Sequence, residues 1–250
     1  MATREVSLIL NRKFIVFEGL DGSGKSTLIK LLKTELEKLH QRVTLTREPG
    51  GTELGEELRQ IILRKDKEAP TARTELLLYE AIRAQHVEKL ITPALKNNEW
   101  VLCDRFAASS IAFQAAGRKI SEEDVQWLNS FATEKLTAGM TVLLDLTFDE
   151  AQSRQSKRFE DKGESADRME SEDRSFHERV RASFLNQAKA AALVHLKSPN
   201  SNSSDQFQKQ HHHNNNHPIS PWIVLSAMQS PENLLTILIQ KLKEQGVWEF

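Results

Sequence analysis

Residues 13–26, KFIVFEGLDGSGKS, decide the fold of this chain. The first six residues form a nearly continuous apolar run, which is typical of a buried central strand in a parallel sheet. Residues 19–26 match the pattern G-x-x-x-x-G-K-[ST] at every fixed position, and an apolar helical periodicity begins at Lys25. A strand, a glycine loop and a helix in this order turn backbone N–H groups and a helix N-terminus toward a phosphate. The stretch therefore predicts a binding site for a nucleoside triphosphate.

Two side chains of this loop have specific roles in the prediction. Lys25 is expected to neutralise the β and γ phosphates, and the hydroxyl of Ser26 is expected to ligate Mg²⁺. The residues predicted to bind the triphosphate are Gly19, Asp21, Gly22, Ser23, Gly24, Lys25, Ser26 and Thr27.

Strand-like and helix-like segments alternate along the rest of the chain. Further strands are predicted at residues 42–46, 100–103, 141–146 and 222–226. Helices are predicted at 25–39, 54–63, 71–96 with a late interruption at Pro93, 121–136, from 149 onward, 173–196 and 231–243. This alternation predicts an α/β fold, a doubly wound, five-stranded parallel sheet flanked by helices. Ligands of such sheets bind at the carboxyl ends of the strands.

The composition limits the size of the fold and the kinds of partner. With 250 residues, 39% of them hydrophobic, the chain fits one α/β domain or two small ones, and we expect a single domain over residues 1–250. Lys plus Arg is 34 and Asp plus Glu is 35, so a net charge of −1 predicts no nucleic-acid partner. One cysteine cannot form an internal disulfide, and no apolar run reaches 18 residues. We therefore expect a cytoplasmic protein with no membrane partner.

One tract departs from the alternation. Residues 197–221 contain only Phe207 and Ile219 as hydrophobic residues, too few to offset the entropy of ordering the segment, so a flexible polar insertion is predicted. Its four histidines, at 211–213 and 217, could bind a transition metal. A solvated low-complexity loop is the favoured interpretation, because no second cluster completes a closed site.

A triphosphate loop alone is compatible with a switch GTPase, a motor-type ATPase or a small-molecule kinase. The chain has no Asn-Lys-x-Asp motif for reading guanine and no Asp-x-x-Gly after a strand, as a switch needs. The charge balance does not support the basic face of a nucleic-acid motor. A second anion site would favour a kinase, because transfer to a phosphorylated acceptor requires two polyanions to be held together.

Side chains near the ends of the predicted strands are candidates for that second site. Taken singly, each has a structural explanation as a core aromatic residue or a surface charge. Together they predict an acceptor pocket beside the triphosphate. They are Arg47, Glu48 and Pro49 after the second strand, Tyr79 and Arg83 one turn apart on a helix, Asp104 and Arg105 after the third strand, and Ser109, Ser110, Phe113 and Gln114 beyond it.

These motifs resemble those of bacterial-type thymidylate kinases, a family of P-loop nucleoside monophosphate kinases. The resemblance is carried by FEGLDGSGKST (17–27), TREPGGT (46–52), LLLYEAIRAQHV (76–87), DRFAASSIAFQ (104–114), LLDLTFDEAQSRQSKR (143–158), DRME (167–170) and SFHERVRASFL (175–185). It implies transfer of the ATP γ-phosphoryl group to dTMP, which gives dTDP and ADP for dTTP synthesis. It also implies Mg²⁺ as cofactor and a homodimer that pairs through helices beside the acceptor site.

The resemblance also implies roles for the candidate residues. Asp21 accepts a hydrogen bond from the deoxyribose 3′-hydroxyl, and Asp104 binds Mg²⁺ directly or through water. Tyr79 stacks on thymine, Arg83 orients base and phosphate, and Arg105 holds the acceptor phosphate. Ser110 and Gln114 border the pyrimidine edge. The implied dTMP-binding set is Asp21, Arg47, Glu48, Pro49, Tyr79, Arg83, Arg105, Ser109, Ser110, Phe113 and Gln114.

A mobile lid over residues 154–170 is implied to close over ATP and to supply cations to the transferring group. Arg154 and Arg158 are its candidate catalytic residues, beside Lys25 and Arg105; Lys157 and Arg168 lie in the same segment. The chain departs from the family pattern in three places: Phe113 stands where tyrosine is usual, Ala115-Ala116 replaces a frequent Gly-Gly, and the lid has extra residues at 160–166.

Two other functions stay open on the residues alone. One is phosphorylation of a different deoxynucleoside monophosphate, and the other is a nucleotide-binding regulatory protein without transferase activity. A phosphate acceptor needs no general base, since a phosphate monoester is largely dianionic at neutral pH. The lack of a His–carboxylate pair in the motifs is therefore compatible with a kinase.

Overall fold

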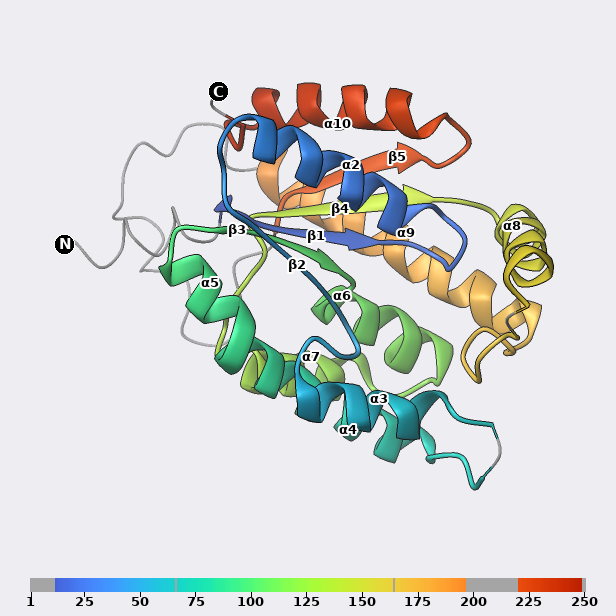
Figure 1. The fold of residues 1–250 in the computed structure, drawn as a ribbon. Helices are drawn as coiled ribbons and strands as arrows, with labels where there is room; N and C mark the ends of the chain where they lie inside the picture. Colours follow the sequence, from blue (N-terminus) through green and yellow to red (C-terminus); the bar gives the residue numbers. More distant parts are fainter. Residues whose placement is uncertain (1–11, 66, 164, 197–219, 249–250) are drawn as a thin grey trace.

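The protein is described by a computed structural model that covers residues 12–65, 67–163, 165–196 and 220–248. The predicted insertion at 197–221 lies outside the described residues except for its last two positions. Five strands form one parallel sheet in the order β2-β3-β1-β4-β5 (Figure 1), which confirms the predicted doubly wound α/β fold. The strands are β1 (Phe14–Glu18), β2 (Val43–Arg47), β3 (Trp100–Asp104), β4 (Met140–Asp145) and β5 (Trp222–Ser226).

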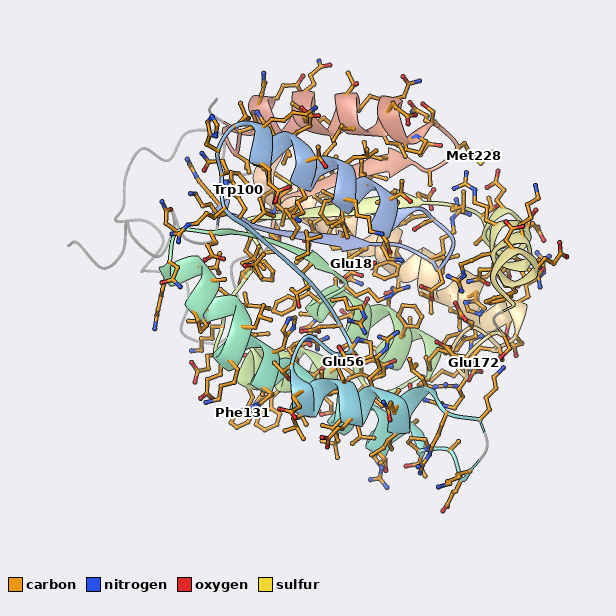
Figure 2. The ribbon with its side chains drawn as sticks, viewed as in Figure 1. Glu18, Glu56, Trp100, Phe131, Glu172 and Met228 are labelled. Carbon is orange, nitrogen blue, oxygen red and sulfur yellow. The ribbon has the colours of Figure 1, made fainter. Side chains whose placement is uncertain are left out.

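The central strand β1 is buried along its whole length. It pairs in parallel with β3, where Phe14 is opposite Val101, and with β4, where Ile15 is opposite Met140. Helices cover both faces of the sheet, so neither face of β1 reaches water and an apolar run is needed there in place of alternation. Glu18 ends the strand as a fully buried carboxyl group, and Figure 2 shows it at the edge where the strands end.

Two layers of helices enclose the sheet (Figure 1). On one face, α2 (Lys25–Lys38) packs against α10 (Pro231–Glu244) and over β1, β2 and β3. On the other face, α9 (Arg174–Leu196) packs on β4 and β5. Each of the first two helices contributes a stripe of buried leucines at helical spacing, which stabilises the layer through burial of apolar area.

The long helix predicted at 71–96 is interrupted near Pro93, as expected. It consists of α4 (Ala72–His86), a π-helical segment η1 (Val87–Ile91) and the short helix α5 (Thr92–Lys96). Pro93 has no N–H to donate to the carbonyl of Lys89, and its ring would collide with that carbonyl in a regular α-helix. The wider π turn before it relieves this conflict. The predicted helix at 54–63 is α3 (Glu53–Leu63).

The segment after β3 contains helical structure that the sequence did not predict. It forms α6 (Ala107–Ser110) and the π-helical segment η2 (Ile111–Gly117), and α7 (Glu122–Ala132) follows. The last helix ends four residues before the predicted position 136. Glu134 and Lys135 both have positive φ, a conformation that cannot continue a right-handed helix. The helix predicted from 149 is α8 (Phe148–Lys162).

Within the described part of the chain, no helix is both long enough and apolar enough to cross a bilayer.

Candidate active site

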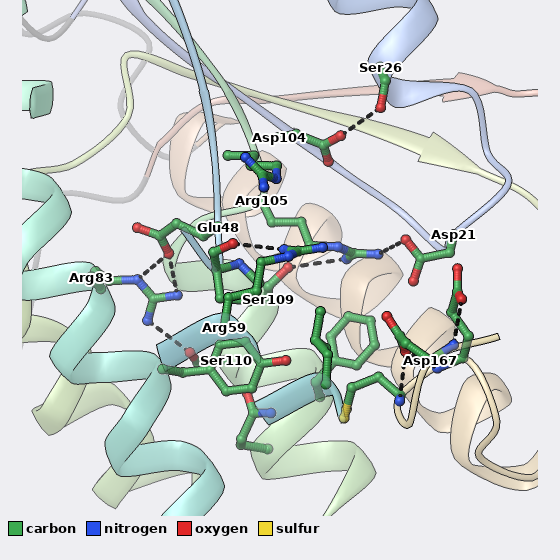
Figure 3. A pocket seen from close by; sticks show the side chains of 18 of the residues that line it. Asp21, Ser26, Glu48, Arg59, Arg83, Asp104, Arg105, Ser109, Ser110 and Asp167 are labelled. Atoms are coloured by element: carbon green, nitrogen blue, oxygen red, sulfur yellow. Dashed lines mark hydrogen bonds and ion pairs between the residues drawn. The ribbon is translucent and has the colours of Figure 1, made fainter. Parts of the chain in front are cut away.

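A cavity of about 670 Å³ opens where the strands end, between the loops after β1, β2 and β3 and the segment that follows α8 (Figure 3). All eleven residues expected to bind the acceptor line it, together with Ser26 and Asp104. The cavity has seven further lining residues that the sequence did not single out as site residues. Arg59 and Leu63 come from α3, and Gly163, Ser165, Asp167, Met169 and Glu170 come from the predicted lid at 154–170.

The phosphate loop holds its lysine inside the protein. Lys25 is buried, and its Nζ donates to the carbonyl oxygens of Gly19 and Leu20 at 3.2 Å each. The hydroxyl of Ser23 is buried and has no hydrogen-bond partner among the described residues. Gly19 has a φ of +136°, and a Cβ there would collide with the backbone oxygen of Leu144, so only glycine fits. A cation and a free hydroxyl in one tight loop match a site for phosphate oxygens.

Ser26 and Asp104 form the candidate metal site. The Ser26 hydroxyl donates to Oδ2 of Asp104 at 3.0 Å (Figure 3), because the first turn of α2 follows the phosphate loop and α2 packs against β3, which ends at Asp104. Lys25 Nζ lies 3.8 Å from the other carboxylate oxygen. A hydroxyl and a carboxylate are hard oxygen ligands of the kind Mg²⁺ takes, with substrate phosphates and water completing its shell.

Arg105 links the phosphate loop to the cavity. Its Nη2 donates to Asp21 Oδ1 at 2.9 Å, and its Nη1 donates to Ser109 Oγ at 3.3 Å. The guanidinium also lies over the ring of Phe113, 4.8 Å from the ring centre. Burial opposes ionisation of Asp21, but the charges of Arg105 and Lys25 outweigh it and hold the pKa of this carboxyl well below its usual range.

The backbone at Arg105 is unusual. Its φ is +72°, a left-handed conformation that costs free energy for a residue with a side chain. The amide of Arg105 donates to the carbonyl of Phe17, and the next amide, of Phe106, donates to Glu18. These two bonds to β1 hold the turn that aims the guanidinium into the cavity.

Arg83 is only 1% exposed, and each of its three nitrogens has protein acceptors. Nε donates to Glu48 at 2.8 Å, and Nη2 donates to the carbonyl of Phe106 at 3.1 Å. Burial lowers its pKa, but Glu48 and Glu80 raise it more, so the pKa of Arg83 lies above its usual range. The three acceptors of Nη1 are Glu80, Ser110 and Asn129. Arg83 is therefore a structural part of the cavity wall, and its hydrogen bond to Ser110 fixes the position of that hydroxyl.

The loop after β2 is anchored on α4. Glu48 accepts from Arg83 with one oxygen, and the other lies 3.0 Å from Nδ1 of the fully buried His86. Nε2 of this histidine lies 2.6 Å from the Thr46 hydroxyl. Gly51 has a φ of +81° and passes so close to the histidine ring that a Cβ would lie 2.6 Å from Nε2. His86 and Glu48 thus form a His–carboxylate pair, which the motifs were not expected to contain. The histidine is fully buried and does not line the cavity, so it is a structural hydrogen-bonding residue.

Arg59 is the most informative of the lining residues that were missed. Its Nη1 donates to the carbonyl of Pro49 at 2.7 Å, so it fixes the same loop from α3. The sequence holds a signal for it, because Gly55, Arg59 and Ile62 share one helical face, and the two flanking residues are buried. Arg47, which the sequence singled out, is half exposed and pairs with Glu56 at 2.8 Å.

The structure separates the cations of the predicted lid. Arg158 lines the cavity, and its Nη2 contacts Glu170 at 2.6 Å. Arg154 does not line it and donates to the carbonyl of Ala227 at 2.8 Å. Arg168 is held by the Ile62 carbonyl at 2.8 Å and by Glu75 at 2.6 Å. Of these three arginines, only Arg158 is at the cavity.

A glycine loop for a triphosphate and a second, arginine-lined pocket at the same sheet edge define the class of P-loop nucleotide kinases. Comparison with known proteins narrows the class. Residues 17–209 match the family model of thymidylate kinase. This chain therefore belongs to the thymidylate kinase family, as its motifs indicated.

Individual relatives agree with the family model. A thymidylate kinase of Bdellovibrio bacteriovorus is 51% identical over 235 residues, which cover 94% of this chain and 97% of that protein. One of an Exiguobacterium species is 46% identical over 68% of this chain and 78% of that protein. The crystal structure of thymidylate kinase from Ehrlichia chaffeensis has a TM-score of 0.62 and 27% identity, covering 92% of this chain and 97% of that one. The predicted enzyme class, phosphoryl transfer from ATP to dTMP, is confirmed.

Proposed function

We propose how the residues of this site divide the work of transferring the γ-phosphoryl group of ATP to dTMP. The observation that carries the proposal is the position of Arg105, which is bonded to Asp21 in the phosphate loop and lines the acceptor cavity. A guanidinium there can contact the acceptor phosphate while the loop beside it holds the donor. The transfer passes through a loose transition state whose charge lies on peripheral oxygens, so alignment and nearby cations supply most of the catalysis.

The cations are proposed to act from different sides. Lys25 leaves its carbonyl partners for the donor phosphates, Arg105 and Arg47 hold the acceptor phosphate, and Arg158 contacts the transferring group from α8. Asp21 accepts from the 3′-hydroxyl of the sugar. No residue removes a proton, since the attacking oxygen belongs to a phosphate that is largely dianionic at neutral pH.

The base end of dTMP is proposed to lie between Tyr79 and Phe113. Tyr79 is partly buried and lines the cavity, and an aromatic ring there can stack on thymine. Ser110 and Gln114 are both 1% exposed and border the same end. Because Arg83 has protein acceptors at all its nitrogens, it is proposed to act on the base by holding Ser110 and Glu48 in place.

Mg²⁺ is proposed as the cofactor, held by Ser26 and Asp104. Bound there, the ion would supply positive charge that neutralises the charge developing on the phosphate oxygens. The described residues contain no cluster of three or more His, Cys, Asp or Glu side chains suited to a metal. A site built from one hydroxyl, one carboxylate and the substrate is consistent with this.

A homodimer is proposed, with α7 at its interface. Trp127 and Phe131 stack on one another at 6.1 Å and are 60% and 75% exposed, and Figure 2 shows Phe131 on the outer surface. A hollow of about 490 Å³ beside them is also lined by Ala84 and Val87. Exposed aromatic pairs beside a hollow are typical of protein interfaces.

A cytoplasmic location of the protein remains a prediction from the sequence.

The test is a panel of acceptors. ADP release from ATP is measured with dTMP, dUMP, dGMP and AMP at equal concentrations. We expect dTMP to give the highest kcat/KM. Preference for another acceptor would assign the chain to a different monophosphate, and ATP binding without acceptor-dependent ADP release would indicate a regulatory protein.

A further inference from the structure

Glu75 is a buried carboxylate that the roles above do not use. It lies in the first turn of α4 and is 0% exposed. Its Oε1 accepts from Nε2 of Gln114 at 2.9 Å, and Oε2 accepts from Nη2 of Arg168 at 2.6 Å. Nε and Nη2 of Arg118 add bonds of 3.1 to 3.3 Å. The carboxylate is therefore held between two guanidinium groups and one amide.

The guanidinium groups keep this carboxylate from turning away from Gln114. Arg168 is itself bonded to the carbonyl of Ile62 at 2.8 Å, and Arg118 is paired with Glu172 at 2.6 Å. Both arginines are thus fixed from a second side. Charge-assisted bonds of this kind are stronger than neutral ones and have a defined direction.

Glu75 determines which end of the Gln114 amide is available to a ligand. A carboxylate only accepts hydrogen bonds, so it must face the NH₂ group of Gln114, and the opposite orientation would bring two acceptor oxygens together in a buried place. Gln114 lines the cavity, and no described residue donates to its Oε1. The end of the amide left for a ligand is therefore a hydrogen-bond acceptor.

We propose that Glu75 is a positioning residue that presents Gln114 to the substrate base as an acceptor, so that the cavity selects pyrimidines with an N3–H donor. Thymine and uracil carry that donor, whereas a 4-aminopyrimidine carries a bare, accepting N3. The proposal rests on the proposed function, because it requires that the cavity holds the base of the acceptor. An accepting N3 against Oε1 leaves two buried acceptors unpaired, which costs about tenfold or more in selectivity.

The probe pair is dTMP and 5-methyl-dCMP, which share methyl group, sugar and phosphate and differ in the N3 and C4 groups of the base. Wild type is expected to prefer dTMP. In Glu75→Gln the amide introduced at position 75 can face Gln114 with either its oxygen or its NH₂ group. The amide of Gln114 can then adopt either orientation. We expect the ratio of kcat/KM for the two acceptors to fall at least about tenfold. A purely structural role of Glu75 would lower both values in proportion, and an unchanged ratio overturns the proposal.

Two further variants make the test specific. Glu172→Gln removes the negative charge that pairs with Arg118 and leaves the bond from Gln114 to Glu75, so its ratio is expected to match wild type. Gln114→Met removes the reading group and is expected to lose the preference as Glu75→Gln does, and the double variant is expected to lose no more. Full preference in Gln114→Met overturns the proposal even where Glu75→Gln does not fold.

The outcomes also separate this inference from the proposed function. If wild type fails to phosphorylate dTMP, the proposed function is wrong. If wild type phosphorylates dTMP and the ratio is the same in Glu75→Gln, only the role of Glu75 is wrong.

Discussion

The backbone of Arg105 is strained, and hydrogen bonds with neighbouring residues hold it in that conformation. Its left-handed backbone is held by two amide bonds to β1, and its guanidinium reaches both Asp21 and the cavity. A residue with relaxed backbone at this point would aim its side chain elsewhere. Strain of this sort persists only where the surroundings over-determine it, and functional sites are where it is usually found.

Removal of this guanidinium should be severe. We expect Arg105→Ala to lower kcat by about 10³-fold or more, because a cation beside the transferring phosphate is lost. Steady-state ADP release with dTMP measures the effect. The control is Arg42→Ala, a well-exposed arginine at the opposite edge of the sheet, which should leave kcat unchanged. Near-normal turnover of Arg105→Ala would refute the role assigned to it.

Glu18 gives a prediction about pH. It is fully buried, accepts from the amide of Phe106 at 3.0 Å and from Ser109 Oγ at 2.7 Å, and burial raises its pKa from 4.5 to about 7 against the opposing charge of Arg105. The folded state therefore binds this proton more tightly than the unfolded state. The contribution of Glu18 to stability is complete below about pH 4.5 and is lost as the pH rises through 7.

Glu18→Gln should remove this dependence. Between pH 5 and 7, we expect the free energy of unfolding of wild type to fall relative to that of the variant, by up to about 1.4 kcal/mol per pH unit. Urea unfolding at several pH values measures the slopes. Glu123→Gln, on the exposed face of α7, is the matched control. Parallel pH profiles of wild type and Glu18→Gln would contradict the assignment.

At the scale of elements, α8 carries two candidate catalytic arginines one turn apart. Arg158 lines the cavity, whereas Arg154 is bonded to the carbonyl of Ala227. We expect Arg158→Ala to lower kcat with dTMP at least about tenfold, with little change in the KM for dTMP, since this arginine acts on the transferring group. Arg154→Ala is the comparison and should cost less. A larger loss in Arg154→Ala would mean that α8 turns that face toward the phosphates during catalysis.

The strands were predicted from sequence to within two residues. β1, β3 and β4 are buried apolar runs, whereas the edge strand β2 is partly exposed and was recognised from the β-branched residues of VTLTR. The segment at 107–117 was missed. Ala112, Phe113, Gln114 and Ala115 are all buried, so the segment has no polar face and no helical periodicity for the sequence to reveal.

The residues of the site also fall into two groups, those that the sequence predicted and those that it did not. Residues directly after strands, such as Arg47 and Arg105, are readable from sequence because parallel strands end at one edge. Arg59, Glu75 and Asp167 reach the site or its wall only through the packing of α3, α4 and the segment after α8. Glu75 belongs to no quoted motif, Arg59 is marked only by buried neighbours on its helical face, and Asp167 lies in the DRME motif at 167–170 without a role assigned from sequence. The folded arrangement is needed to place all three at the site.

For the whole molecule, the exposed pair Trp127 and Phe131 leads to a test of assembly. We expect wild type to sediment as a dimer at micromolar concentration and Phe131→Asp to shift it toward monomer, because a charge cannot be buried in an apolar interface without a partner. Analytical ultracentrifugation measures the shift. Leu193→Asp, a similarly exposed position on α9, should stay dimeric. A monomeric wild type would contradict the proposed interface.

The net charge of −1 conceals how the charges are distributed. Lys25, Arg83, Arg105 and Arg158 lie at or beside the cavity, and each has an acidic partner within 4 Å. Substrates thus compete with carboxylates that are already in place. Local pairing of this kind allows two polyanions to bind without a basic surface that would attract nucleic acid.

The sheet polarity has a practical consequence for work with this protein. Residue 12 precedes β1, and Leu196 and Ser220 flank the entry to β5, so these points lie at the edge where the strands begin, opposite the cavity where they end. An anchor or fluorophore attached at residue 12 or 220 would leave the cavity facing away from the support. The chain is therefore suited to surface immobilisation and to single-molecule recording of turnover.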